Sequence, residues 1–155
     1  MTSPQGISLV RHRTAPALVV WVCLVCCLSG LTRAARAEEV VIVNPDVTAK
    51  ELPLNALRAI FGMRLRTWPN GNRIAVVVLN DSSPAHARFA KQTLAIFPHQ
   101  LRLAWDRLVY SGTGQAPIEV ASETEMRAKV ASTTDAIGYL PVEMVNDSVR
   151  ILQIK

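Results

Sequence analysis

One segment constrains the fold more than any other: the apolar run from Ile74 to Leu79, which leads directly into a helix-start signal. A short continuous run that is rich in β-branched residues predicts a strand buried on both faces of a sheet. The next residues, Asn80-Asp81-Ser82-Ser83-Pro84, place a serine at the cap position and a proline at the first helical position. We therefore expect the chain to pass from a buried strand, through a polar loop, into a helix.

Strand and helix patterns alternate along the rest of the chain. The apolar patterns and their flanking turn signals predict strands at 40–43, 74–79, 118–120, 136–140 and 149–154. Residues 63–79 could form a hairpin across the turn at 69–72. Helices are predicted at 54–61 with Gly62 as the stop, at 84–96, at 98–110 and at 123–132. This alternation predicts one α/β domain with a mixed, mostly parallel sheet flanked by helices.

The first 37 residues have the pattern of a secretory signal peptide. Basic residues at 11–13 precede the uncharged, mostly apolar run 15–31, and Ala35-Arg36-Ala37 offers small residues where a signal peptidase reads. We therefore expect a leader at 1–37, a mature domain at 38–155 and a periplasmic location. An uncleaved membrane anchor is the alternative, because the run is just long enough to span a bilayer; the small-residue site favours cleavage.

Cysteine usage and charge both differ between the leader and the rest of the chain. All three cysteines lie at 23–27, so residues 38–155 have no thiol nucleophile, disulfide or cysteine metal site. Four of the 17 basic residues and none of the 12 acids precede Glu38, which leaves residues 38–155 with a formal charge of +1. The basic pI of the whole chain therefore does not indicate a nucleic-acid partner.

The loop after the strong central strand is the main candidate for a ligand site. Ligands of open α/β sheets bind where strand ends feed helix starts, and open backbone N–H groups with serine hydroxyls can hold an oxyanion. The predicted oxyanion ligands are Asn80, Asp81, Ser82, Ser83 and Arg88. The carboxylate of Asp81 would repel a dianion, but it could accept a proton from an oxyanion that carries one. The alternative is that Ser83 or Asp81 only caps the helix.

Other candidate sites are weaker. Ser111, Gly112 and Thr113 resemble a phosphate loop, but they follow a helix, where Gly112 is better explained as a C-cap and where the helix dipole repels anions. His86 and His99 lie 13 residues apart with no cysteine or paired carboxylate at ligand spacing, so we expect neither a metal nor a cofactor. No nucleophile stands beside a base and no dinucleotide fingerprint occurs, so we do not expect an enzyme.

Three segments together resemble a known family. They are Leu57-Arg58-Ala59-Ile60-Phe61-Gly62 with Trp68 six residues on, Phe89 after the serine loop, and Ala136-Ile137-Gly138-Tyr139-Leu140. This combination is similar to the phosphate-binding periplasmic proteins of ABC transporters, and more closely to their short, single-domain relatives. The resemblance implies a single periplasmic-binding-protein-like lobe, phosphate or a related anion as ligand, and a membrane permease or sensor as partner.

The chain departs from this family at the loop that would hold the anion. The family has an arginine shortly before a Ser-Gly-Thr motif. Here the arginine is absent and only the serine carries over, as Ser82 or Ser83. Pro84 stands in place of the glycine and Ala85 in place of the threonine. Full-length members hold the anion between two lobes, and this chain has room for one. Two functions therefore remain open: a module that binds phosphate weakly, or a protein-interaction or sensor accessory domain that keeps only the fold.

Overall fold

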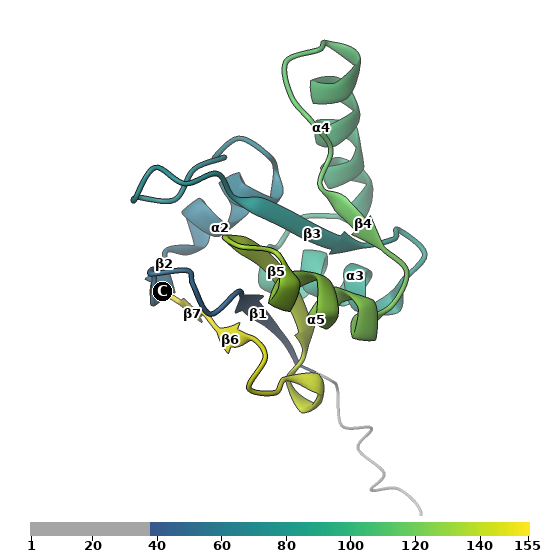
Figure 1. Cartoon of the computed structure of the whole chain (residues 1–155). Helices are drawn as coiled ribbons and strands as arrows, with labels where there is room; N and C mark the ends of the chain where they lie inside the picture. Colours follow the sequence, from purple (N-terminus) through teal and green to yellow (C-terminus); the bar gives the residue numbers. More distant parts are fainter. Residues whose placement is uncertain (1–37) are drawn as a thin grey trace, which may run out of the picture. The chain divides into compact units, whose positions relative to one another are not determined.

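A five-stranded sheet runs through the computed structural model, which describes residues 38–155 (Figure 1). Its strands lie in the order β4-β3-β5-β1-β6. Their bounds are β1 Glu39–Val43, β3 Ala75–Leu79, β4 Ile118–Val120, β5 Ala136–Pro141 and β6 Arg150–Ile151. Two further short strands, β2 (Glu51–Leu52) and β7 (Gln153–Ile154), pair with each other in parallel as a separate sheet.

Helices cover both faces of the five-stranded sheet. Their bounds are α2 Leu54–Phe61, α3 Pro84–Arg88, the π-helical turn η1 Phe89–Thr93, α4 Pro98–Tyr110, α5 Glu123–Ser132 and the 3₁₀ turn η2 Val142–Met144. Helix α5 packs on one face, whereas α2, α3 and η1 pack on the other (Figure 1). The predicted α/β architecture, a mixed and mostly parallel sheet flanked by helices, is confirmed.

Strand directions follow the prediction except at β1. Strand β3 runs parallel to β4 and β5, whereas β1 is antiparallel to both of its neighbours, β5 and β6. A continuous apolar run such as 40–43 is typical of parallel sheets, and for β1 that interpretation is wrong. The run is buried because helices cover both faces of the sheet, and burial on both faces does not depend on strand direction.

Three predicted elements differ in detail from the structure. The helix at 84–96 leaves α-helical geometry at Phe89, and a π-type bond from Leu94 N to Phe89 O (3.1 Å) ends it. The strand at 149–154 divides into β6 and β7, which belong to different sheets. The hairpin at 63–79 is reduced to a single antiparallel bridge between Thr67 and Arg73.

Helix α2 ends with a left-handed residue that is not the glycine. Gly62 has φ −78°, and Met63 takes the left-handed position at φ 58°. Met63 N donates to Ile60 O (2.8 Å) and Arg64 N donates to Ala59 O (2.8 Å), which is the Schellman bonding pattern. Burial of the Met63 side chain offsets the cost of this backbone conformation.

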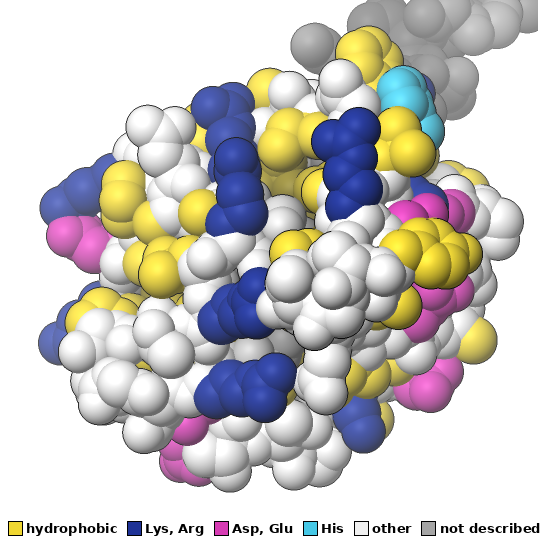
Figure 2. Space-filling view, turned by 90° about the horizontal axis from the view of Figure 1, so that it is seen from above, with side chains coloured by type: hydrophobic (Ala, Val, Ile, Leu, Met, Phe, Trp, Pro, Cys, Tyr) yellow, Lys and Arg dark blue, Asp and Glu magenta, His cyan; other side chains and the backbone are white. Residues whose placement is uncertain are grey.

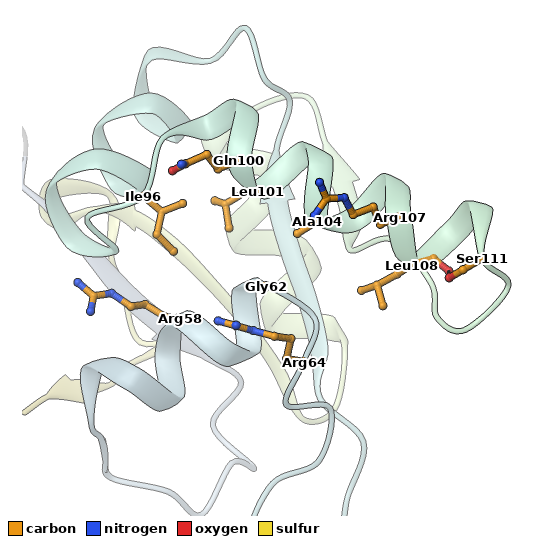
Figure 3. Close-up of a pocket in the computed structure, with 10 residues that line it drawn as sticks. All are labelled: Arg58, Gly62, Arg64, Ile96, Gln100, Leu101, Ala104, Arg107, Leu108 and Ser111. Carbon is orange, nitrogen blue, oxygen red and sulfur yellow. Dashed lines mark hydrogen bonds between the residues drawn. The ribbon is translucent and has the colours of Figure 1, made fainter.

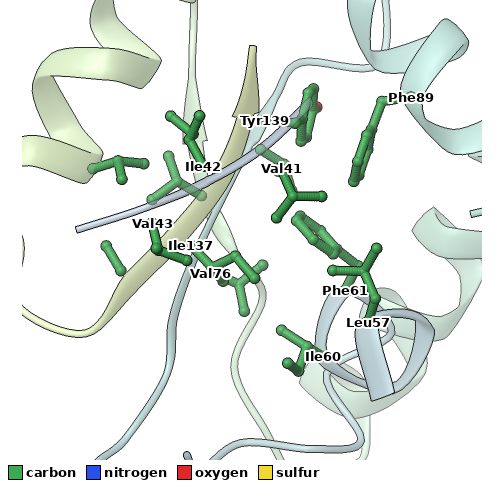
Figure 4. Close-up of a cluster of buried hydrophobic side chains, with 14 of the residues drawn as sticks. Val41, Ile42, Val43, Leu57, Ile60, Phe61, Val76, Phe89, Ile137 and Tyr139 are labelled. Carbon is green, nitrogen blue, oxygen red and sulfur yellow. The ribbon is translucent and has the colours of Figure 1, made fainter. Parts of the chain in front are cut away.

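An aromatic cluster joins the sheet to the helices on one face (Figure 4). The ring of Phe89 stacks on Tyr139 with centroids 3.9 Å apart, and Phe61 meets Phe89 edge-on at 4.8 Å. The Tyr139 hydroxyl accepts from Leu79 N (2.9 Å) and lies 2.6 Å from His86 Nδ1. These three aromatic residues come from the three segments that carry the family resemblance, so those segments meet in the core.

The hydroxyl of Tyr139 gives a first test of this core. We expect Tyr139→Phe to lower the free energy of unfolding by about 1–3 kcal/mol, because it leaves Leu79 N–H and His86 Nδ1 buried without a partner. Urea unfolding measures the change. Tyr110→Phe is the matched control, because Tyr110 is 88% exposed. Equal stability of the two variants would contradict the role given to the hydroxyl.

Gly138 gives a second test, on the opposite face of the sheet. A Cβ at this position would lie 2.6 Å from Met126 Sδ and 3.0 Å from Val130 Cγ2, both on α5. We expect Gly138→Ala to destabilise the fold by about 1–3 kcal/mol through overpacking, as measured by urea unfolding. Because the clash is mainly with the sulfur of Met126, Met126→Ala removes it. The double variant Gly138→Ala/Met126→Ala should therefore lose less unfolding free energy than the sum of the two single variants. Strict additivity would argue against direct contact.

Candidate functional site

The loop that links β3 to α3 lies at the carboxyl edge of the sheet. Strands β3 and β4 are parallel and end at Leu79 and Val120. Beyond the paired residues, Asn80 N donates to Val120 O at 3.3 Å, which holds the loop against the neighbouring strand. The sequence prediction therefore places Asn80–Ser83 correctly between a strand and a helix. This edge is where open α/β sheets bind ligands.

Both serine hydroxyls of the loop already have partners within it. Ser83 is the N-cap of α3, and its Oγ accepts from His86 N at 3.4 Å. Ser82 Oγ donates to Asn80 Oδ1 at 2.7 Å. The backbone N–H groups of Asp81 and Ser82 have no acceptor in the described part of the chain. The loop can thus offer two backbone donors to an anion, with the hydroxyls available only if they turn.

An ion network borders this loop. Arg102 Nε on α4 donates to Asp81 Oδ2 at 2.7 Å, and Arg102 Nη2 donates to Glu119 Oε2 at 3.0 Å. The hydrogen bond that Arg102 donates to Asp81 raises the pKa of Arg102, so the guanidinium stays charged. Two carboxylates face one guanidinium here, and like charges near an anion weaken its binding. The network therefore opposes a fully ionised ligand.

The predicted ligand Arg88 is bound to another carboxylate. Its Nη2 and Nε lie 2.6 and 2.9 Å from Glu39 Oε1, at the start of β1. Glu39 is 7% exposed, and burial raises the pKa of its carboxyl despite the arginine. Its second oxygen, Oε2, is buried without a hydrogen-bond partner among the described residues. Arg88 thus neutralises a buried acid, and the structure does not bring its guanidinium to the loop.

His86 is the buried titratable group of this site. It is 1% exposed, its Nε2 has no hydrogen-bond partner in the part of the chain described, and that nitrogen lies 3.8 Å from Asp81 Oδ1. Burial lowers the pKa of His86, so the ring is neutral at pH 7. The sequence alone suggests no role for this histidine other than that of a metal ligand, which its spacing from His99 disfavours. Its position in the first turn after a serine cap is the signal that could have placed it beside the loop.

The weaker candidates lie at the C-terminal end of α4. Gly112 has φ 68°, Gly112 N donates to Val109 O and Thr113 N donates to Leu108 O, so the C-cap interpretation of Gly112 is confirmed. Ser111 Oγ lies 2.8 Å from Thr113 Oγ1. These residues are not near the Asp81 network, and Ser111 lines a separate pocket. No cluster of metal-ligating side chains occurs in residues 38–155.

Comparison with known proteins supports the fold. No protein-family model and no curated protein matches the sequence. Among solved structures, the chain is similar to an ABC-type phosphate transport receptor from Vibrio cholerae, with 20% identity and a TM-score of 0.59 over 75% of this chain. A candidate phosphate ABC transporter substrate-binding protein from Clostridium perfringens, with bound phosphate, is 18% identical, with a TM-score of 0.62 over 75% of this chain. PstS from Borrelia burgdorferi is 17% identical, with a TM-score of 0.58 over 76% of this chain.

The match covers less than half of each of these larger proteins: 45%, 44% and 47% of their chains, respectively. At this level of identity the likeness shows the fold, and the predicted single lobe of the periplasmic-binding-protein type is confirmed as architecture. In residues 38–155, no helix is long and apolar enough to cross a bilayer. The predicted leader at 1–37 lies outside the described residues.

The neutral state of His86 predicts a pH dependence of stability. Below its ordinary pKa of about 6.5 the unfolded chain takes up a proton that the folded chain excludes, so stability falls as the pH drops. The contribution of one such group is at most about 1.4 kcal/mol for each pH unit. The free energy of unfolding in urea between pH 7.5 and 5.5 should therefore fall less steeply in His86→Gln than in the wild type. Parallel slopes would contradict the assignment.

Proposed function

We propose that the protein is a non-enzymatic, periplasmic solute-binding module that takes a protonated oxyanion, hydrogenphosphate, weakly at the loop Asn80–Ser83. The observation that carries this proposal is the pair of backbone N–H groups at Asp81 and Ser82, open at the carboxyl edge of β3. Backbone donors at a strand-to-helix loop suit an oxyanion. The structural neighbours named above include a protein with bound phosphate, which supports the choice of ligand.

Asp81 determines which oxyanion suits the loop. Its carboxylate can only accept a hydrogen bond, so a ligand beside it needs a proton to donate. Hydrogenphosphate carries such a proton at neutral pH, whereas sulfate does not. Arg102, held 2.7 Å from Asp81, partly offsets the negative charge that the ligand meets. The loop should therefore prefer phosphate to sulfate.

Weak affinity follows from the same contacts. Arg88 is bound to Glu39, and Glu119 adds a second carboxylate to the network. The Asp81 side chain is 44% exposed, and charge interactions at such exposed positions are weak. A module of this kind would release its ligand readily. A membrane permease or sensor is the corresponding partner.

The second candidate function is a ligand-free protein-interaction or sensor accessory module. The observation that favours it is the outer surface of α4, where Leu103, Val109 and Tyr110 are 52%, 47% and 88% exposed. Large apolar side chains at such exposure are typical of contact surfaces. The ion network at Asp81 would then be purely structural.

Thermal melting separates the two functions. We expect phosphate to raise the melting temperature, by the equivalent of about 1.4 kcal/mol when phosphate is ten times its Kd. Sodium chloride and sodium sulfate at matched ionic strength should not do so. Ser83→Ala should lose the phosphate effect together with the helix cap, whereas Ser132→Ala, an exposed serine on α5, should keep it.

Two outcomes would contradict oxyanion binding at this loop. If neither phosphate nor sulfate shifts the melting temperature, the interaction module is favoured. If phosphate acts but none of the loop variants Ser82→Ala, Ser83→Ala and Asp81→Asn changes the phosphate effect or its selectivity over sulfate, the anion binds elsewhere. Asp81→Asn tests the selectivity, because without the carboxylate sulfate should raise the melting temperature as phosphate does.

A further inference from the structure

A pocket of about 660 Å³ lies between α4 and the end of α2 (Figure 3). Arg58 and Arg64 approach it from α2 and the turn that follows, and Arg107 approaches it from α4. The residues that line it include none from the loop Asn80–Ser83 and none from the ion network around Asp81. It is therefore a different site from the one proposed above.

The pocket carries positive charge without compensation. Three arginines and no acidic residue line it, and none of the three pairs with a carboxylate in the part of the chain described. Arg58 Nε donates to Leu94 O at 2.6 Å, which fixes this side chain against the wall and leaves its two terminal nitrogens available. Figure 2 shows that basic side chains also gather on one face of the molecule, with acidic ones toward the margins of that view.

The floor of the pocket is apolar. Leu101 is buried at 3% exposure, and Ile96 and Leu108 are partly buried against the hydrophobic core. The volume lies within the range of small-molecule sites, roughly 300–1,000 Å³. An inorganic anion would leave this floor in water, and a neutral apolar molecule would leave three guanidinium groups without a counter-charge. The occupant that matches both features has an anionic head and an apolar body.

We propose that this pocket binds a small amphipathic carboxylate. The planar guanidinium groups of Arg64 and Arg107 would hold the carboxylate, because the two groups match in bidentate geometry. The hydrocarbon body would lie on Ile96, Leu101 and Leu108. Neither the proposed phosphate site nor its failure affects this inference, since the two sites share no residue.

Calorimetric titration of the full-length protein with octanoate tests the proposal. We expect acetate, which has the head alone, and 1-octanol, which has the body alone, each to bind at least tenfold more weakly than octanoate. The double variant Arg64→Gln/Arg107→Gln should weaken octanoate binding at least tenfold. Lys50→Gln/Lys129→Gln removes two exposed cations outside the pocket and should leave octanoate binding unchanged.

Further variants separate loss of octanoate binding from loss of folding. Arg64→Lys/Arg107→Lys keeps both charges but loses the bidentate geometry, so it should bind octanoate more weakly than the wild type and more tightly than the double glutamine variant. Urea unfolding checks that each variant is folded. Ser83→Ala should bind octanoate as the wild type does. The proposal is overturned if octanoate does not bind, if it binds the double glutamine variant equally well, or if octanol or acetate binds as tightly.

Discussion

The side chain of Tyr139 is the contact on which the rest of the structure depends. Its ring stacks on Phe89 at 3.9 Å and so fixes the helical segment that follows the candidate loop. Its hydroxyl accepts the Leu79 N–H at the end of β3 and meets His86 in the first turn of α3. One side chain on the central strand β5 therefore fixes both ends of the loop Asn80–Ser83. A buried hydroxyl with two partners is costly to leave unsatisfied, which favours this one arrangement.

Local signals in the sequence predicted the elements, and long-range contacts decided what they do. The strand at 74–79, the cap at Ser83 and the stop at Gly112 depend on neighbouring residues, so they could be predicted directly. The pairs Arg88–Glu39 and Arg102–Asp81 join residues that lie 49 and 21 positions apart. Nothing near Arg88 in the sequence indicates that a buried acid on β1 will bind it.

The family resemblance concerned the core more than the ligand. Phe61, Phe89 and Tyr139 lie in the resembling segments, and they pack together between the sheet and its helices. Their spacing is therefore explained by packing, which agrees with a likeness to solved structures in fold at low identity. The loop at 80–85 is where the sequence departs from the family, and its serines are occupied within the chain.

The two candidate sites carry opposite charge. At the loop, Asp81 and Glu119 outnumber Arg102, whereas the pocket beside α2 has three arginines and no acid. A protonated oxyanion at the loop is the central claim, and amide shifts in a ¹⁵N-labelled protein titrated with phosphate test it most directly. The account predicts that the largest shifts fall on the Asp81 and Ser82 amides. Shifts confined to the residues around Arg64 and Arg107, with the loop amides unchanged, would contradict it.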